Sequence, residues 1–265
     1  MKKYNYHSIT AVIALVISLL PGCRKAIDFL EDNPTAAFCP CRIAQFGYTG
    51  LFGTDTVTFT YNSAGDPVTG IRVHPGTGNP NFFFRYDQRG RFTDLIGGFG
   101  QTTFDRGVES WDRYFYDGRG RIVKDSAYFF PGIVNGNPTI DSRLLTSVEI
   151  ITYEYDTKNR VSKQTVVFSP GFSLVNSYSY NADGNLAGHD YDDKINYHRT
   201  NRVWMFIDRD YSVNNPVIAT YEYNDFGLPT RIVPFEGTAG SFAAAAHTRY
   251  EYVDADIRYS CLGKL

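Results

Sequence analysis

Alternating apolar and polar residues dominate the chain beyond its first fifty positions. In residues 56–61, Val57, Phe59 and Tyr61 alternate with threonines, and residues 217–223 repeat the pattern. Side chains of a strand point in turn to its two faces, so this period of two predicts strands with one apolar face. No long window carries the 3.6-residue apolar stripe of an amphipathic helix. The pattern therefore predicts an all-β chain.

One short phrase, an aromatic residue, any residue and then tyrosine, recurs seven times. The copies end at Tyr61, Tyr86, Tyr116, Tyr155, Tyr180, Tyr223 and Tyr252. In the first six copies the next residue is Asn or Asp, and the fourth residue after the tyrosine is glycine, or Asn159 in the fourth copy. Asn and Asp bond to the backbone two residues on, and glycine accepts a positive φ, so each copy predicts a hairpin closed by a bulged tight turn. The seventh copy lacks the turn residues and is expected to end the array.

Hairpins in series predict one strongly curled antiparallel sheet, a half-barrel or spiral. Curling buries the ring-bearing face and limits open edges, and a closed β-sandwich is the alternative. The rings are expected to form the core, although some could stay exposed and stack on sugars or peptides. The longest excursion, residues 190–216, contains the apolar segment 202–207, for which both a strand and a short helix remain open.

The first residues of the chain predict an export signal. Two lysines precede an apolar run at residues 9–20, which is shorter than the roughly 20 residues that span a bilayer as a helix. The run ends in Leu-Pro-Gly-Cys, which resembles the lipobox of bacterial lipoproteins. That resemblance implies cleavage after Gly22 and acylation of Cys23, with more than one acyl chain for stable anchoring.

These features divide the chain into three parts. Residues 1–22 are expected to be the signal peptide, residues 23–45 the lipidated cysteine, a tether and the start of the first strand, and residues 46–265 the β domain. The expected location is the cell envelope. Arg24, directly after the cysteine, favours the outer membrane, while the periplasmic or surface face stays open.

Three cysteines remain after Cys23, namely Cys39, Cys41 and Cys261. An exported chain allows disulfides, and a bridge between residues two apart is geometrically poor. A link from Cys39 or Cys41 to Cys261 is therefore favoured, with three free thiols as the alternative. A Cys-x-Cys pair without a second ligand pair does not predict a zinc site.

The hairpin phrases resemble the tyrosine–aspartate (YD) repeats of RHS-type proteins. Residues 113–122, Arg-Tyr-Phe-Tyr-Asp-Gly-Arg-Gly-Arg-Ile, match the family pattern almost position by position, and residues 85–92 are nearly as close. Large RHS proteins wind such repeats into a closed shell around a toxin, for which this chain is too short. It is more similar to small YD-repeat lipoproteins of Bacteroidota, through residues 191–196 and 210–216. The resemblance implies a fold and a location in the cell envelope, but it implies no catalysed reaction.

Composition narrows the possible functions. Lys plus Arg number 26 and Asp plus Glu 28, so the net charge of −2 lacks the electrostatic footprint of a nucleic-acid binder. No His-Glu-x-x-His, P-loop or Gly-x-Ser-x-Gly motif occurs, and we predict no catalytic residue, no cofactor and no metal site. The candidate ligand-site residues lie in or beside the longest excursion: His189, Asp190, Asp192, Asp193, His198 and Trp204. The polar ones could hold a metal or form a solvated loop, since their spacing is not diagnostic.

The sequence predicts a cell-envelope lipoprotein that acts as a non-catalytic binding or scaffold module. Its expected partners are the membrane, through Cys23, and a glycan or protein ligand. The alternatives are an enzyme acting on an envelope or extracellular polysaccharide or peptide, and a carrier of an apolar ligand. An exposed aromatic strip would support binding, a cleft with convergent carboxylates an enzyme, and a dry concave cavity a carrier.

Overall fold

The computed structural model describes residues 23–38, 40–50, 53–140, 148–168, 171–245 and 248–262. The signal-peptide prediction for residues 1–22 and the Cys39 alternative lie outside the described residues. Thirteen of the described strands form one antiparallel sheet in the order β12-β11-β10-β7-β6-β5-β4-β3-β2-β1-β17-β14-β13. The all-β prediction is confirmed.

The strands of the large sheet are β1 (Cys41–Gly50), β2 (Gly53–Tyr61), β3 (Pro67–Arg72), β4 (Asn81–Tyr86), β5 (Phe92–Gly98), β6 (Val108–Tyr116), β7 (Ile122–Phe129), β10 (Val148–Tyr155), β11 (Val161–Val167), β12 (Ser173–Ser177), β13 (Ala219–Tyr223), β14 (Pro229–Pro234) and β17 (Asp254–Cys261). Two small hairpins stand apart from it, β8 (Gly132–Val134) with β9 (Asn137–Thr139), and β15 (Gly240–Ala245) with β16 (Thr248–Tyr252). The helical elements are α2 (Cys23–Asp32), the 3-10 helix η1 (Tyr197–Thr200) and α3 (Arg202–Asp208).

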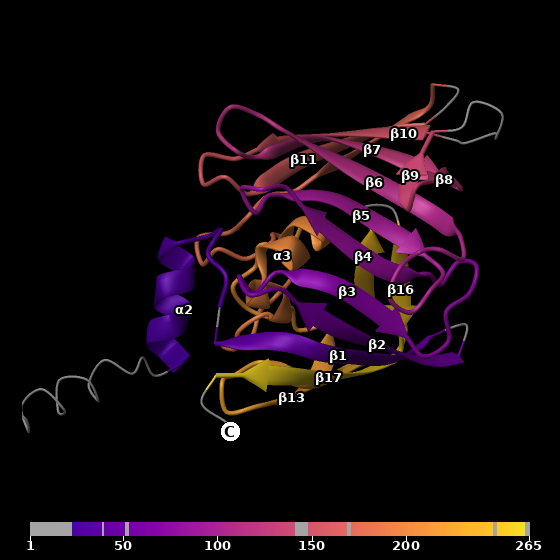
Figure 1. Cartoon of the computed structure of the whole chain (residues 1–265). Coiled ribbons are helices and arrows are strands. Elements are labelled where there is room, and N and C mark those ends of the chain that lie inside the picture. The colour runs from indigo at the N-terminus through magenta and orange to yellow at the C-terminus, as the bar shows by residue number, and fades with distance from the viewer. Residues whose placement is uncertain are drawn as a thin grey trace, which may run out of the picture.

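The large sheet curls around α3 without closing (Figure 1). Its two end strands, β12 and β13, are not paired with each other. One curled sheet of consecutive hairpins is therefore confirmed, and the closed β-sandwich alternative is wrong. The residues between β12 and β13 supply η1 and α3, so the longest excursion occupies the concave side of the sheet.

The repeat turns have the predicted geometry. The five turn glycines have φ between +73° and +91°, and Asn159 has φ +61° in the fourth copy. In each bulged hairpin the register shifts at the tyrosine, as it does between Arg85 and Tyr86. The Asp87 side chain accepts a bond from the amide of Arg89, two residues on. A local signal of two residues therefore sets each turn.

The apolar segment 202–207 forms α3, and this helix completes the core. Asn201 caps it by accepting a bond from the amide of Val203, and Arg209 ends it in the left-handed region with φ +54°. Trp204 packs edge-on against Phe59 and Phe84, with ring centroids 5.0 and 5.6 Å apart. The helix therefore gives this part of the ring-bearing face of the sheet its partner.

A second aromatic contact set extends along the same helix. Phe206 lies edge-on to Tyr114 and Tyr153, at 5.5 and 5.1 Å. The first aromatic residue of four successive repeats thus contacts one helical turn of side chains. Edge-on pairs of this kind stabilise by about 1 kcal/mol each beyond the area they bury.

The segment that the sequence indicated as a tether begins as a helix packed on the domain. Leu30 of α2 is 1% exposed and packs with Ile195, Val213 and Leu228. Ala26 and Ile27 lie partly buried against the same cluster, so the i, i+1 and i+4 spacing of these three residues gives α2 one apolar face. Figure 1 shows α2 outside the sheet, beside the ends of the hairpins.

The first and last strands of the large sheet in chain order are joined covalently. β1 pairs with β17 along its length, and a disulfide links Cys41 to Cys261 across 220 residues of sequence. This is one of the two pairings that the sequence left open. It joins the two ends of the domain through two strands that are paired on both sides within the sheet.

Candidate functional site

The repeat tyrosines connect neighbouring hairpins through their hydroxyl groups. Three repeat hydroxyls donate to the backbone oxygen of the residue two positions past the preceding turn glycine, at 2.6 to 2.7 Å: Tyr86 to Pro67, Tyr116 to Phe92 and Tyr155 to Ile122. Tyr259 of β17 lies outside the repeats but makes the same bond to Pro229, at 2.8 Å. Tyr61 makes the corresponding bond to Ile43 of β1, at 2.7 Å. Tyr180 departs from the pattern and donates to Arg209 at the end of α3. A repeated bond of this geometry requires tyrosine, since phenylalanine offers no donor.

An aspartate and an arginine in each central turn extend this connection. Asp87 accepts two bonds from the Arg91 guanidinium, at 2.7 Å each. That guanidinium lies 4.7 Å from the centroid of the Tyr116 ring in the next repeat. The Arg121 guanidinium is paired with Asp117 in the same way and lies 4.9 Å from the Tyr155 ring. These arginines therefore cover one face of the next tyrosine.

A pocket of about 680 Å³ opens where these turns meet α3. We call it the turn-end pocket. Its buried lining includes Val203, Met205 and Phe206 of α3, which are at most 7% exposed. Its exposed lining includes Arg119 of the β6–β7 turn and Arg202 at the start of α3. The pocket thus combines an apolar floor with a cationic rim.

The charge of the rim is not fully compensated. Four arginines line the pocket, and two of them, Arg91 and Arg121, are neutralised by their own turn aspartates. No carboxylate of the described chain lies within ion-pair distance of Arg119 or Arg202. Asp66 is the acidic residue in the lining. Two guanidiniums therefore remain available to a ligand.

The N-terminal segment lies beside this pocket. Thr35, three residues beyond α2, belongs to its lining. The buried Arg199 side chain donates to the backbone oxygens of Leu30, Asn33 and Pro34. Burial lowers the pKa of Arg199 to about 10, so it remains a cation at neutral pH. Arg199 therefore holds the end of α2 next to the turn-end pocket.

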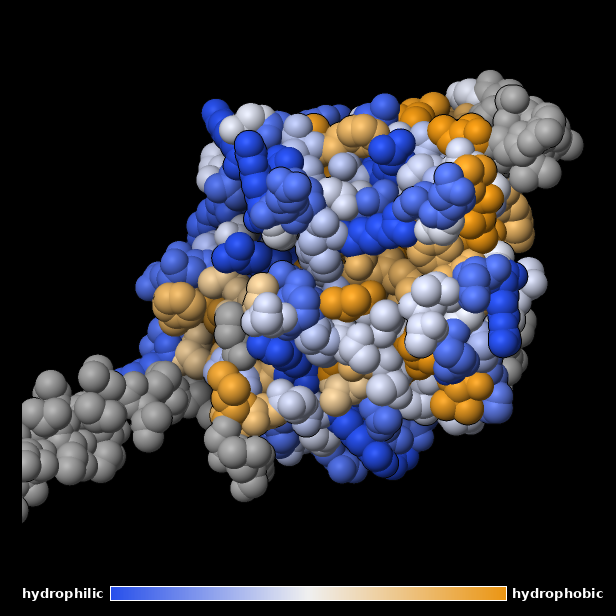
Figure 2. Space-filling model, in the orientation of Figure 1, coloured by the Kyte–Doolittle hydropathy of each residue, from blue (hydrophilic) through white to orange (hydrophobic). Residues whose placement is uncertain are grey.

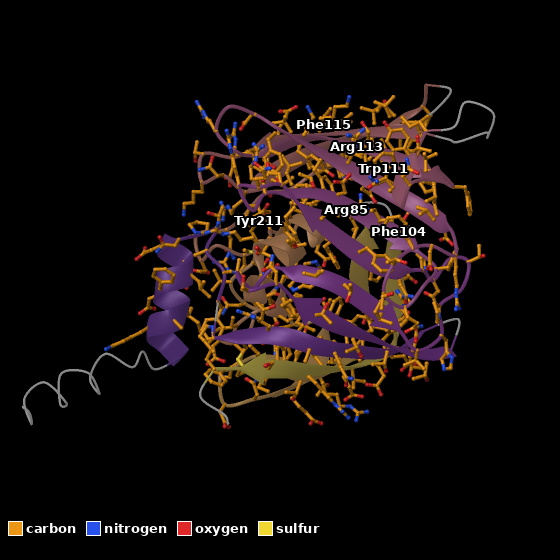
Figure 3. All side chains as sticks on the ribbon, in the orientation of Figure 1. Arg85, Phe104, Trp111, Arg113, Phe115 and Tyr211 are labelled. Carbon is orange, nitrogen blue, oxygen red and sulfur yellow. A yellow bond between two sulfur atoms is a disulfide. The ribbon has the colours of Figure 1, made fainter. Side chains whose placement is uncertain are left out.

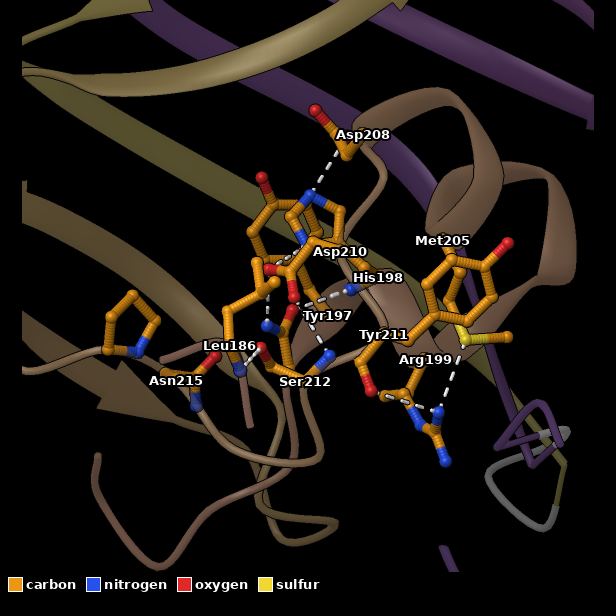
Figure 4. A network of polar contacts seen from close by, with 12 residues as sticks. Leu186, Tyr197, His198, Arg199, Met205, Asp208, Asp210, Tyr211, Ser212 and Asn215 are labelled. Atoms are coloured by element: carbon orange, nitrogen blue, oxygen red, sulfur yellow. Dashed lines mark hydrogen bonds and ion pairs between the residues drawn. The ribbon is translucent and has the colours of Figure 1, made fainter. Parts of the chain in front are cut away.

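His198 lies away from that pocket, in the network of Figure 4. Its Nε2 is 2.9 Å from Asp208 Oδ2 and its Nδ1 is 3.2 Å from Asp210 Oδ2. Burial alone would lower the pKa of His198, but the two carboxylates outweigh it and raise the pKa to about 9. A 7% exposed, charged histidine between two carboxylates connects η1 to the end of α3.

The structure separates the candidate ligand-site residues of the sequence. His189, Asp190 and Asp193 are exposed, whereas Trp204 is 2% exposed in the core and does not line the turn-end pocket. Asp192 accepts from the amide of Asn215 and from the Tyr223 hydroxyl, a structural role between the excursion and β13. Across the described ranges, no three His, Cys, Asp or Glu side chains come together as a metal site would require.

The concave face contains a buried pair of carboxyl groups that the sequence analysis did not predict. Asp112 of β6 and Asp125 of β7 are 0% exposed on the concave face. Burial, together with the charge of the neighbouring Asp112, raises the pKa of Asp125 well above its usual value. Arg209 favours the charged form of Asp125. The signal that could have found the pair is its position, since both residues interrupt the apolar face of a predicted strand.

The convex face carries a smaller aromatic cluster. Arg113 lies over the rings of Trp111 and Phe115, at 4.8 and 5.8 Å, and Arg85 lies over Phe104 at 5.1 Å (Figure 3). Trp111 and Phe104 are at most 8% exposed. The view in Figure 2 is mainly hydrophilic, with small hydrophobic patches. Arginines therefore cover the buried rings of Trp111 and Phe104, whereas Phe115 stays 41% exposed.

Comparisons with known proteins add little to this geometry. No family model matches the sequence, and no curated protein matches it. The solved structures that it resembles include a porin-like protein from Bacteroides uniformis, with a TM-score of 0.43 and 12% identity over 83% of this chain and 96% of that chain. They also include TcdB2-TccC3 without its hypervariable C-terminal region, with a TM-score of 0.25 and 13% identity over 69% of this chain and 10% of the other. Likenesses of this size carry no argument for this chain.

The described helices are all too short or too polar to cross a bilayer.

Proposed function

We propose that the protein is a cell-envelope lipoprotein of the YD-repeat type and that it acts as a non-catalytic binding module. In this proposal acyl chains on Cys23 hold it at the outer membrane, and the turn-end pocket receives its ligand. The curled sheet serves as the rigid support of that pocket.

The observation that carries the proposal is the placement of α2. This helix begins at Cys23 and is fixed to the domain by Leu30 and by the Arg199 bonds. A lipidated Cys23 would therefore attach the domain directly to the bilayer surface, rather than through a long tether. Thr35 places the turn-end pocket close to the same end of the molecule.

The groups in the pocket favour binding. Guanidinium groups donate several hydrogen bonds in a fixed geometry, and apolar side chains offer a surface to desolvate. The lining includes Asp66 as its acidic residue, whereas hydrolysis of a glycosidic bond usually requires a pair of carboxyl groups. These features support a binding role over the enzyme alternative.

Acyl labelling in bacterial cells tests the anchor. Cells expressing the full chain are fed an alkyne-tagged fatty acid, and the purified protein is assayed for the tag. We expect the wild type to carry the tag and to fractionate with the outer membrane, and Cys23→Ser to carry none. A tagged Cys23→Ser variant or an untagged wild type would overturn the lipoprotein proposal.

A further inference from the structure

We propose that the turn-end pocket binds an anionic amphiphile, an alkyl or acyl chain that ends in a phosphate group. The inference rests on the proposed function, because it takes the turn-end pocket as the binding site. It names the chemical class of the ligand.

The head group is assigned by the rim. Arg119 and Arg202 are exposed, line the pocket and face no carboxylate partner among the described residues. Guanidinium groups bind phosphate with two parallel N–H bonds. Asp66 opposes them with a single negative charge, so one negative charge on the head group restores the balance.

The apolar floor of the turn-end pocket indicates the alkyl or acyl chain of the ligand. Val203 and Phe206 of α3 line the pocket and keep 6% and 7% of their surface exposed, whereas Met205 in the same lining is fully buried. Phe92 and Ile122, at the starts of β5 and β7, continue this apolar surface. Removing such surface from water favours an apolar chain, whereas a free phosphate would leave it wet.

A sugar fits this pocket less well than an amphiphile. Sugars bind to proteins by stacking on open aromatic faces, and the repeat tyrosines would have to offer them. The Arg91 and Arg121 guanidiniums already lie over the rings of Tyr116 and Tyr155. The hydroxyls of both tyrosines donate within the sheet and cannot donate again. The tyrosines here are structural, which leaves the rim arginines and the floor for the ligand.

Calorimetric titration of the intact chain in a non-ionic detergent tests the ligand class. The probes are hexyl phosphate, inorganic phosphate, uncharged hexyl glucoside and a trimer of glucuronic acid. We expect hexyl phosphate to bind once per chain and at least about tenfold more tightly than the other three, since both rim and floor contribute. A glucuronate trimer that binds as tightly as hexyl phosphate, or no binding of hexyl phosphate, would overturn the assignment.

The repeats supply a matched pair of variants. Arg119 and Arg89 occupy the same position of successive turns, but Arg119 lines the pocket and Arg89 does not. We expect Arg119→Glu combined with Arg202→Glu to weaken hexyl phosphate binding at least about tenfold, and Arg89→Glu to change it less than about twofold. Equal losses in both proteins would indicate a general charge effect and would refute the site.

A chain-length series tests the floor separately. From butyl to octyl phosphate, each added methylene that enters the pocket should tighten binding by roughly threefold. An affinity independent of chain length would refute the amphiphile and leave only a phosphate site.

Two further readouts are needed. One distinguishes a bilayer lipid from a free amphiphile as the ligand, and the other distinguishes failure of the ligand proposal from failure of the lipid-anchor proposal. Retention of a phospholipid by the chain after incubation with phosphatidylglycerol vesicles would indicate a bilayer source, whereas hexyl phosphate binding without lipid retention would indicate a free amphiphile. Both results support the ligand class. A chain that is acyl-labelled at Cys23 but binds no hexyl phosphate refutes this inference alone, and an unlabelled chain that binds it refutes the anchor alone.

Discussion

The repeat tyrosines carry hydroxyl groups that join each hairpin to the previous one. For Tyr86, Tyr116 and Tyr155 the bond ends two residues past the preceding turn glycine, so the position of the donor and that of its acceptor are set by the same short motif. Burial raises the pKa of Tyr116 to about 12, and the hydroxyl therefore stays protonated throughout the physiological range.

Replacing Tyr116 with Phe tests this bond. We expect a loss of roughly 1 kcal/mol in the free energy of unfolding, because the Phe92 carbonyl loses its partner in a partly buried place. Urea titration followed by tryptophan fluorescence measures it. Tyr128→Phe is the control, since the Tyr128 ring packs at a tilt against Trp111 and its hydroxyl donates no hydrogen bond to a described residue. A loss equal to that of the control would show that the hydroxyl contributes nothing.

His198 makes the stability of the fold depend on pH. Its pKa is raised to about 9 between Asp208 and Asp210, compared with about 6.5 in an unfolded chain. The folded state therefore holds a proton that the unfolded state releases, and the resulting stabilisation, up to roughly 3 kcal/mol, is complete below pH 6.5 and is lost as the pH rises to 9.

Replacing His198 with Gln should remove this pH dependence. We expect the wild type to lose stability between pH 6.5 and 9 and the variant to be less stable at pH 6 but nearly flat across the same window. Denaturant titrations at several pH values measure both curves. Parallel curves for the two proteins would contradict the charged state of His198.

The hairpin is the unit of the fold at the next scale, and most of it could be predicted from the sequence. The alternation of residues 56–61, the Asn or Asp and the turn glycine are local features, and the turn depends on the residues within it. The sequence did not predict in the same way that α3 would pack against the aromatic rings of the repeats. Residues 203–207 are apolar on all sides, so their periodicity leaves strand and helix open, and their burial in α3 is decided by the concave side of the sheet.

The turn glycines give the element-scale prediction. Gly120 has φ +78° and no atom would lie within 4 Å of an added Cβ, so only the backbone conformation opposes a side chain there. We expect Gly120→Val to cost roughly 1–2 kcal/mol, since a β-branched residue disfavours the left-handed region. Thermal and urea unfolding measure the loss.

Gly118 provides the matched control in the same turn. It lacks a positive φ and likewise has open space around its Cβ position, so Gly118→Val should change stability far less. If the two variants were equally stable, backbone strain at Gly120 would not explain the glycine.

The whole molecule depends on contacts between residues far apart in sequence. β1 lies between β2 and β17, and the disulfide of Cys41 with Cys261 joins the two ends of the domain. Arg199 reaches 169 residues back to the backbone oxygen of Leu30. These contacts keep α2 and the pocket lining in one body.

Removing the disulfide should test how far this closure stabilises the fold. In the chain-entropy model a loop of this length contributes roughly 5 kcal/mol, and we expect the Cys41→Ser and Cys261→Ser double variant to lose up to that amount. Wild type in dithiothreitol is the control and should unfold at the same urea concentration as the variant. A variant as stable as the oxidised wild type would show that the pairing of β1 with β17 needs no covalent link.

The sequence by itself determined the hairpins, their turns and the curl that follows from joining them in series, because those features depend on side-chain alternation and on backbone conformation within a few residues. It also placed the polar candidates of the longest excursion in one group, but the tertiary structure separated them and buried His198 between Asp208 and Asp210. The turn-end pocket was decided only by the tertiary structure. Its arginines lie on different turns and on α3, and only the curl of the whole sheet around that helix brings them to one opening.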